Sequence, residues 1–118
     1  MTALAATYGF TADKGATFSQ VIKWRDSNGD LMNLSGYSAS LVVREKTTAA
    51  NVVLTLSTSN GGITLGTTNG EIILSASDED MDISSGQYTY TLELTSASGE
   101  VTRLLLGAFI IRSDIFRI

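Results

Sequence analysis

The sequence contains no cysteine, no histidine and no proline among its 118 residues. Without cysteine the chain forms no disulfide and supplies no thiolate nucleophile or zinc ligand. Without histidine it has no serine–histidine pair for nucleophilic catalysis, no imidazole acid or base and no histidine metal ligand. These absences argue against most hydrolases. We therefore expect a protein that is not an enzyme and that carries no cofactor.

Charge is also scarce, since charged residues make up 17% of the chain and the formal net charge is −4. The lysines and arginines are scattered and form no basic run, whereas nucleic-acid binding needs a basic footprint. No apolar run approaches the roughly 18 residues of a membrane span. The first six residues lack the basic and apolar regions of a secretory signal. We expect neither a nucleic-acid partner nor a membrane partner.

What the sequence has in quantity is threonine and serine, 15 and 14 residues respectively, together with 11 glycines. Threonine suits pleated, half-buried strands, and serine and glycine suit turns. Turn signals recur about every ten residues, which is typical of a sandwich or barrel. The pattern predicts an all-β fold, an antiparallel, immunoglobulin-like β-sandwich of seven to nine strands. We expect the sandwich over residues 15–112, an N-terminal arm or edge strand over 1–14 and a C-terminal tail over 113–118.

Apolar residues alternate along several of the expected strands, as they do in half-buried strands. Residues 87–95 place Tyr88, Tyr90, Leu92 and Leu94 on one face, and residues 16–25 place Phe18, Ile22 and Trp24 on one face. We expect both faces to point into the core. Residues 76–83 break the alternation, and their sequence predicts one short helical turn capped by Ser77.

The last expected strand, residues 100–112, is apolar on both faces. One face carries Val101, Arg103, Leu105, Phe109 and Ile111, and the other carries Leu104, Leu106, Ala108 and Ile110. In a two-layer sandwich the outer face of a strand has no partner within the layer pair. Two explanations stay open: a contact with another subunit covers this face, or a terminal segment of the same chain folds over it.

Both terminal segments are apolar as well. The same two explanations apply, because such segments either pair with an edge strand of their own sandwich or reach a neighbouring subunit. The residues that we regard as interface candidates are apolar or aromatic and lie in the two terminal segments or on the last strand: Leu4, Tyr8, Phe10, Leu104, Leu106, Ile110, Ile115 and Phe116.

A cluster of acidic residues, Asp78, Glu79, Asp80 and Asp82, is the best candidate for metal chemistry. Calcium takes several carboxylate and carbonyl oxygens, but the spacing matches no EF-hand loop. Asp78, Asp80 and Asp82 are thus weak metal candidates, and a solvated acidic turn is the favoured interpretation. The segment 26–30, with its Asn-Gly pair, is interpreted as a hairpin turn.

The order of turns and strand ends from Gly15 onward resembles a family of small β-sandwich proteins of tailed bacteriophages and prophages. That family includes the collar protein that anchors the L-shaped side fibres of some siphophage tails. The resemblance covers residues 15–112 and rests on these segments in this order: Gly15-Ala16-Thr17-Phe18, Lys23-Trp24-Arg25-Asp26, Asn28-Gly29-Asp30, Leu34-Ser35-Gly36-Tyr37, Val43-Arg44-Glu45, Gly61-Gly62-Ile63-Thr64-Leu65-Gly66, Asn69-Gly70-Glu71-Ile72-Ile73-Leu74, the acidic turn, residues 85–94 and residues 99–107.

The resemblance implies a virion structural protein that is made in the cytoplasm of the bacterial host. Its partners would be further copies of itself, arranged in a ring, and other phage structural proteins such as tail tube or fibre proteins. A tail collar or adaptor subunit is the favoured role, and a capsid decoration or head-fibre protein is the alternative. A more distant alternative is a carbohydrate-binding module. It is disfavoured because Trp24, Tyr88 and Tyr90 occupy inward positions, which leaves only Tyr8 and Tyr37 as candidate sugar platforms.

Overall fold

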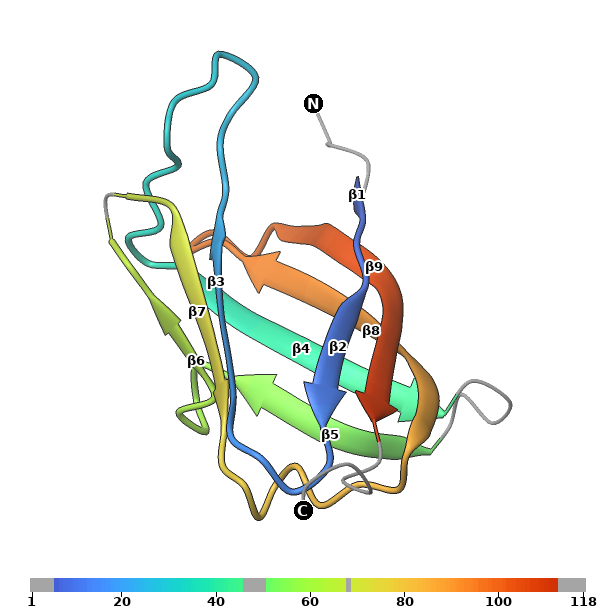
Figure 1. The fold of residues 1–118 in the computed structure, drawn as a ribbon. Coiled ribbons are helices and arrows are strands. Elements are labelled where there is room, and N and C mark those ends of the chain that lie inside the picture. The colour runs from blue at the N-terminus through green and yellow to red at the C-terminus, as the bar shows by residue number, and fades with distance from the viewer. Residues whose placement is uncertain (1–5, 46–50, 68, 113–118) are drawn as a thin grey trace.

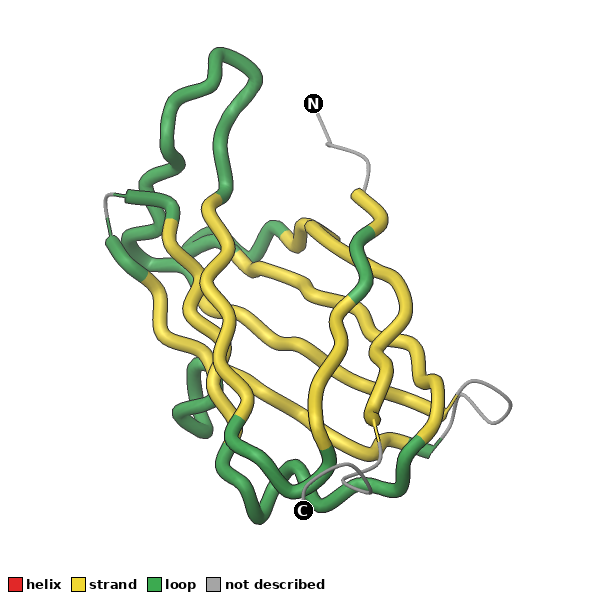
Figure 2. The backbone as a smooth tube through the Cα atoms, viewed as in Figure 1, coloured by secondary structure: helices red, strands yellow, loops and turns green. Residues whose placement is uncertain are grey.

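The computed structural model of the protein describes residues 6–45, 51–67 and 69–112. These residues form strands and loops with no helix (Figure 2), so the predicted all-β fold is confirmed. Accordingly, no helix of the described residues could cross a membrane. The strands of this part of the chain are β1 (Ala6–Thr7), β2 (Phe10–Asp13), β3 (Phe18–Lys23), β4 (Ser38–Glu45), β5 (Val52–Ser57), β6 (Ile63–Leu65), β7 (Glu71–Ala76), β8 (Gly86–Thr95) and β9 (Val101–Arg112).

The strands form two sheets that pack face to face as a β-sandwich (Figure 1). The larger sheet has the order β1-β9-β8-β4-β5, and β2 also pairs with β9. The smaller sheet has the order β3-β7-β6. The chain turns sharply between strands at glycines with positive φ, such as Gly29 (φ 85°) and Gly99 (φ 93°). Such angles favour glycine because it has no Cβ.

The N-terminal segment is an edge of the larger sheet. β1 and β2 both run parallel to β9, with Ala6 opposite Leu105 and Phe10 opposite Phe109. The Tyr8 amide bridges the two short strands by donating to the Leu106 carbonyl at 2.9 Å. Of the two explanations for the N-terminal segment, pairing within the same chain thus applies to residues 6–13. The pairing is parallel, unlike the remaining strand pairs of the described residues, which are antiparallel.

The core lies between the two sheets and is apolar throughout. Alternate residues of β8 point into it, and Tyr90, Leu92 and Leu94 are buried as predicted. Phe10, Phe18 and Phe109 gather at one side of the core, where the Phe18 and Phe109 rings lie 5.3 Å apart and the Phe10 and Phe18 rings 5.9 Å apart. Because Phe10 and Phe109 belong to the larger sheet and Phe18 to the smaller, these rings connect the two layers.

A β-bulge in β9 changes which residues face outward. Glu93 pairs with Arg103 but Leu92 pairs with Leu105, so Leu104 is an extra residue in the ladder. Leu104 and Leu105 both pack partly against the core. The bulge reverses the alternation before it, and Val101 and Arg103 are exposed. The prediction that these two residues share a face with Leu105, Phe109 and Ile111 is therefore wrong, because a period-two pattern does not survive an inserted residue.

The segment between β7 and β8 forms a tight turn. The Met81 amide donates to the Ser77 carbonyl at 3.0 Å, and the Asp80 amide donates to Ser77 Oγ at 3.1 Å. Ser77 therefore accepts the hydrogen bonds expected of a capping residue, and residues 78–81 form a hydrogen-bonded turn that is not continued as a helix. Met81 is fully buried, which fixes this turn against the end of the sandwich.

Candidate assembly surface

The outer face of β9 carries an apolar stripe of Leu106, Ala108 and Ile110. Phe109 and Ile111 are 0% and 2% exposed and point into the core, so the residues that alternate with them, Leu106, Ala108 and Ile110, point away from it. Leu106 and Ile110 are each 37% exposed. The bulge thus explains why Leu104 and Leu105, which follow one another in the sequence, both pack partly against the core. It does not explain Leu106, Ala108 and Ile110, which form an apolar surface on the outer face.

The residues that pair with this stripe across the sheet are uncharged, whereas the next outward residue along β9 after Ile110 is Arg112, which forms an ion pair with Asp13. On β8, Thr91 pairs with Leu106, Thr89 with Ala108 and Gln87 with Ile110. On the other side, Thr11 of β2 pairs with Ile110. Hydroxyl and amide groups cost less to remove from water than ionised groups do. A partner could therefore cover the stripe and these paired residues without burying a charge.

The other predicted interface residues have different surroundings. Tyr8 is 52% exposed, whereas Phe10 is 2% exposed and Leu104 packs partly against the core. Phe10 thus offers no contact surface in this conformation, because the pairing of β2 with β9 turns its ring inward. Leu4, Ile115 and Phe116 lie outside the described residues.

Tyr8 is held at the edge of the larger sheet by its backbone. The Tyr90 hydroxyl donates a hydrogen bond to the Tyr8 carbonyl at 2.7 Å, in addition to the bond between the Tyr8 amide and Leu106. Burial raises the pKa of the Tyr90 hydroxyl to about 12, and the nearby Tyr8 acts in the same direction. A neutral, donating Tyr90 therefore anchors this segment. Among the described residues, Tyr8 is the one exposed aromatic, and Tyr37 packs edge-on against Trp24.

The acidic turn after β7 is exposed. Asp82 forms an ion pair with Lys14 Nζ at 2.7 Å, and the Gly15 amide donates to the Met81 carbonyl beside it. The hydrogen bond and the charge of Lys14 lower the pKa of Asp82. Asp78 and Asp80 are exposed, and the described residues contain no group of three or more carboxylates placed to hold a metal ion. These two contacts connect the acidic turn to Lys14 and Gly15, which precede β3.

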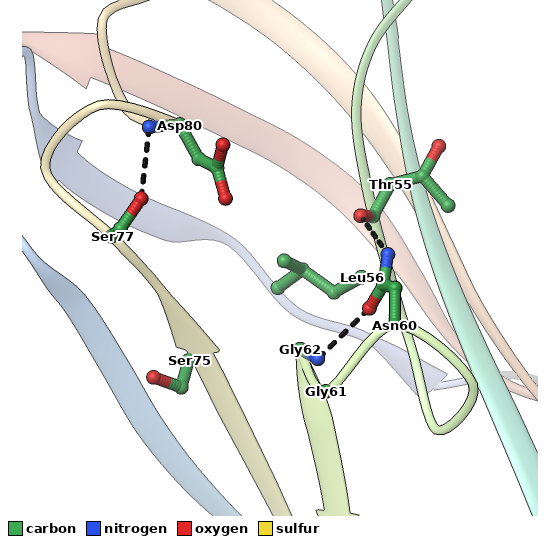
Figure 3. A pocket seen from close by; sticks show the side chains of 8 residues that line it. All are labelled: Thr55, Leu56, Asn60, Gly61, Gly62, Ser75, Ser77 and Asp80. Carbon is green, nitrogen blue, oxygen red and sulfur yellow. Dashed lines mark hydrogen bonds between the residues drawn. The ribbon is translucent and has the colours of Figure 1, made fainter.

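A polar hollow of about 300 Å³ lies between the β5–β6 turn and the end of β7 (Figure 3). Its lining residues are Thr55, Leu56, Asn60, Gly61, Gly62, Ser75, Ser77 and Asp80. The Asn60 amide donates to the Thr55 carbonyl at 2.9 Å and accepts from the Ser57 and Gly62 amides at 2.9 and 2.8 Å. The Asn60 side chain in this hollow is therefore already hydrogen-bonded to the backbone through both its nitrogen and its oxygen.

This arrangement also covers part of a sheet edge. Thr55 and Ser57 belong to β5, the edge strand of the larger sheet opposite β1. The Asn60 side chain donates to the Thr55 carbonyl and accepts from the Ser57 amide, and both of these backbone groups point away from β4. It thus makes the two hydrogen bonds that a residue of an added strand would make. Sequence reasoning did not assign this role, because an Asn-Gly pair alone predicts only a turn.

Comparison of the sequence with models of known protein families gives no match, and comparison with proteins of curated function gives none either.

Proposed function

We propose that the protein is a structural subunit of a tailed-bacteriophage virion, a tail collar or adaptor subunit. In this role it oligomerises and holds tail fibres or neighbouring tail proteins. The proposal rests on the resemblance of residues 15–112 to the phage β-sandwich family and on the surface of β9. The observation that carries it is the apolar stripe of Leu106, Ala108 and Ile110, in which Leu106 and Ile110 are exposed and whose cross-strand partners on β8 are uncharged.

A ring requires two different surfaces on each copy that meet head to tail and close after a fixed rotation. The stripe supplies one such surface. Full burial of a leucine or isoleucine contributes about 1.5–3 kcal/mol, so covering the exposed third of Leu106 and Ile110 contributes about 0.5–1 kcal/mol each. One stripe is therefore a weak contact. It becomes effective when every copy has two neighbours or when a tail template holds the copies together.

The test is the mass of the purified protein by light scattering after size exclusion, for the wild type and for Leu106→Asp/Ile110→Asp. We expect a discrete multiple of 12.5 kDa for the wild type and a smaller, folded species for the double variant. Val52→Asp is the matched control, because Val52 is an exposed apolar residue on β5 and should leave the mass unchanged. A double variant that folds and assembles like the wild type would refute the stripe as the contact.

The alternatives make different predictions in the same experiment. A capsid decoration or head-fibre protein would be a monomer alone and would bind at sites on the head, so purified tails and heads should be compared as binding surfaces. A carbohydrate-binding module would bind host surface glycans without assembling. That alternative has little support, since Tyr8 is the one exposed aromatic of the described residues and its backbone is held against β9.

A further inference from the structure

The strand β3 is an edge strand, because no strand in the described part of the chain pairs with its outer side. It pairs with β7 on one side and has no strand on the other. Figure 1 shows β2, which belongs to the larger sheet, on the side of β3 that faces away from β7, with no strand between the two. Unpaired edge strands present rows of amides and carbonyls to which another strand can bind.

The hydrogen bonds identify which groups of β3 point outward. The Ser75 amide donates to the Gly62 carbonyl, so Ser75 points away from β3, and the alternate residues of β7 point toward it. Their partners Phe18, Gln20 and Ile22 therefore bond to β7. The Trp24 amide, which donates to the Gly70 carbonyl, continues the same alternation. The outward groups are consequently the amides and carbonyls of Ser19, Val21 and Lys23.

The other three edges are less suited to pairing. The Asn60 side chain covers part of the β5 edge. The β6 strand has 3 residues, and the edge beside β9 consists of strands of 2 and 4 residues. By contrast, β3 has 6 residues and no register shift. Val21, at the middle of its outward groups, is 54% exposed although it is aliphatic.

We propose that β3 is a dimerisation edge, at which a second copy of this chain adds its own β3 antiparallel about a two-fold axis through Val21. The result is one continuous six-stranded sheet made of two smaller sheets. Val21 then lies opposite Val21 of the second copy, and Ser19 opposite its Lys23. These three opposing pairs exchange about six main-chain hydrogen bonds, two for each pair of outward residues.

This register places no like charges opposite each other. The two copies of Lys23 lie two residues on either side of the axis, about 13 Å apart along the strand, which exceeds the screening length of roughly 8–10 Å. The two Val21 side chains cover each other on the outer face. On the inner face, Gln20 of one copy lies opposite Ile22 of the other.

An apolar hollow beside the edge supports the same occupant. It measures about 220 Å³ and is lined by Tyr8, Phe10, Gln20, Val21, Ile22 and Leu105. The inward side chains of an added strand, the second copy's Gln20 and Ile22, point toward this hollow. The contact differs from the proposed ring contact, since it is isologous and does not use the stripe on β9.

The test combines solution mass with amide hydrogen exchange, read residue by residue by NMR, over a series of protein concentrations. We expect the mass to double as concentration rises and the amides of Ser19, Val21 and Lys23 to become protected together. The amides of Gln20 and Ile22 already bond to β7 and should be protected at every concentration. This alternating pattern distinguishes strand addition from a contact at the stripe.

Two variants complete the test. Val21→Lys places two lysines directly opposite each other and should abolish both the mass doubling and the new protection. Val101→Lys is its matched control, because Val101 is also 54% exposed and lies on a different strand, and it should retain both. Thermal unfolding followed by circular dichroism verifies that both variants fold. Unprotected Ser19, Val21 and Lys23 amides at all concentrations, or unchanged pairing in Val21→Lys, would overturn the proposal. Neither result would affect a ring formed through the stripe.

Discussion

Gly107 provides a sharp test of how the N-terminal segment is attached. It lies in the middle of β9 with φ 153°, and a Cβ built on it would fall on the carbonyl oxygen of Tyr8 and within 3.0 Å of the Tyr8 carbonyl carbon. The contact atoms are backbone, which cannot rotate away as the end of a side chain can. We therefore expect Gly107→Ala to push the segment between β1 and β2 off β9.

Gly86 is a matched control within the same sheet. It has the same φ of 153°, but a Cβ built there meets only the Tyr88 ring at 3.9 Å, an ordinary van der Waals contact. The strain of a non-glycine residue at this φ is about 1–3 kcal/mol and is common to both variants. Only Gly107→Ala additionally disrupts two hydrogen bonds, from the Tyr8 amide to Leu106 and from Tyr90 to the Tyr8 carbonyl.

The difference between the two variants follows from these bonds. Each lost hydrogen bond costs about 1 kcal/mol, and a hydroxyl left unsatisfied in a buried position costs about 1–3 kcal/mol. We expect Gly107→Ala to lower the free energy of unfolding by about 2–4 kcal/mol more than Gly86→Ala does, by the same bond energies. Urea denaturation measures this difference, and amide exchange of residues 8–13 shows whether the loss is local. Equal destabilisation by the two variants would refute the reasoning.

Two further predictions concern side chains that hold the backbone. Tyr90→Phe removes the bond to the Tyr8 carbonyl and should cost about 1 kcal/mol at neutral pH in urea denaturation. Because the pKa of Tyr90 is raised from 10.0 to about 12, its contribution to stability is complete below pH 10 and declines toward pH 12, so the variant should lose less stability over that range than the wild type. Asn60→Ala removes three hydrogen bonds and should cost about 1–3 kcal/mol and promote aggregation through the opened β5 edge, as seen by light scattering. Asn69→Ala, which removes one bond to the Glu71 amide, is the control and should not aggregate.

Strand content and most of the core could be predicted from the sequence, because alternation is a local property. In residues 87–95 the period of two correctly indicates that Tyr90, Leu92 and Leu94 are buried. The same rule fails in β9, where Leu104 is inserted into the ladder and reverses the faces of Val101 and Arg103. A bulge is a choice of register between two strands, and one strand's sequence does not contain it.

For the candidate surfaces, too, some exposures could be predicted from alternation, and others depend on how the strands pair. Exposure of Leu106 and Ile110 follows from alternation once the inward positions of Phe109 and Ile111 are known. Phe10 has the same apolar character as Tyr8, but it is buried because β2 pairs with β9 and turns it toward Phe18. Whether an apolar terminal segment packs inside or outside depends on this pairing. The edge β3 depends on topology as well, since strand order decides which strands lack a neighbour.

The two proposed contacts together restrict the assembly that the protein can form. The stripe contact is heterologous and closes a ring of any order, whereas the β3 contact is isologous and joins copies in pairs. An assembly that uses both contacts in every copy therefore contains an even number of copies and has dihedral symmetry, as two rings related by two-fold axes. A ring that uses the stripe alone has no such restriction. Native mass spectrometry of the wild type and of Val21→Lys separates these cases: an even number of copies that halves in the variant requires both contacts, and an unchanged number excludes β3 from the assembly.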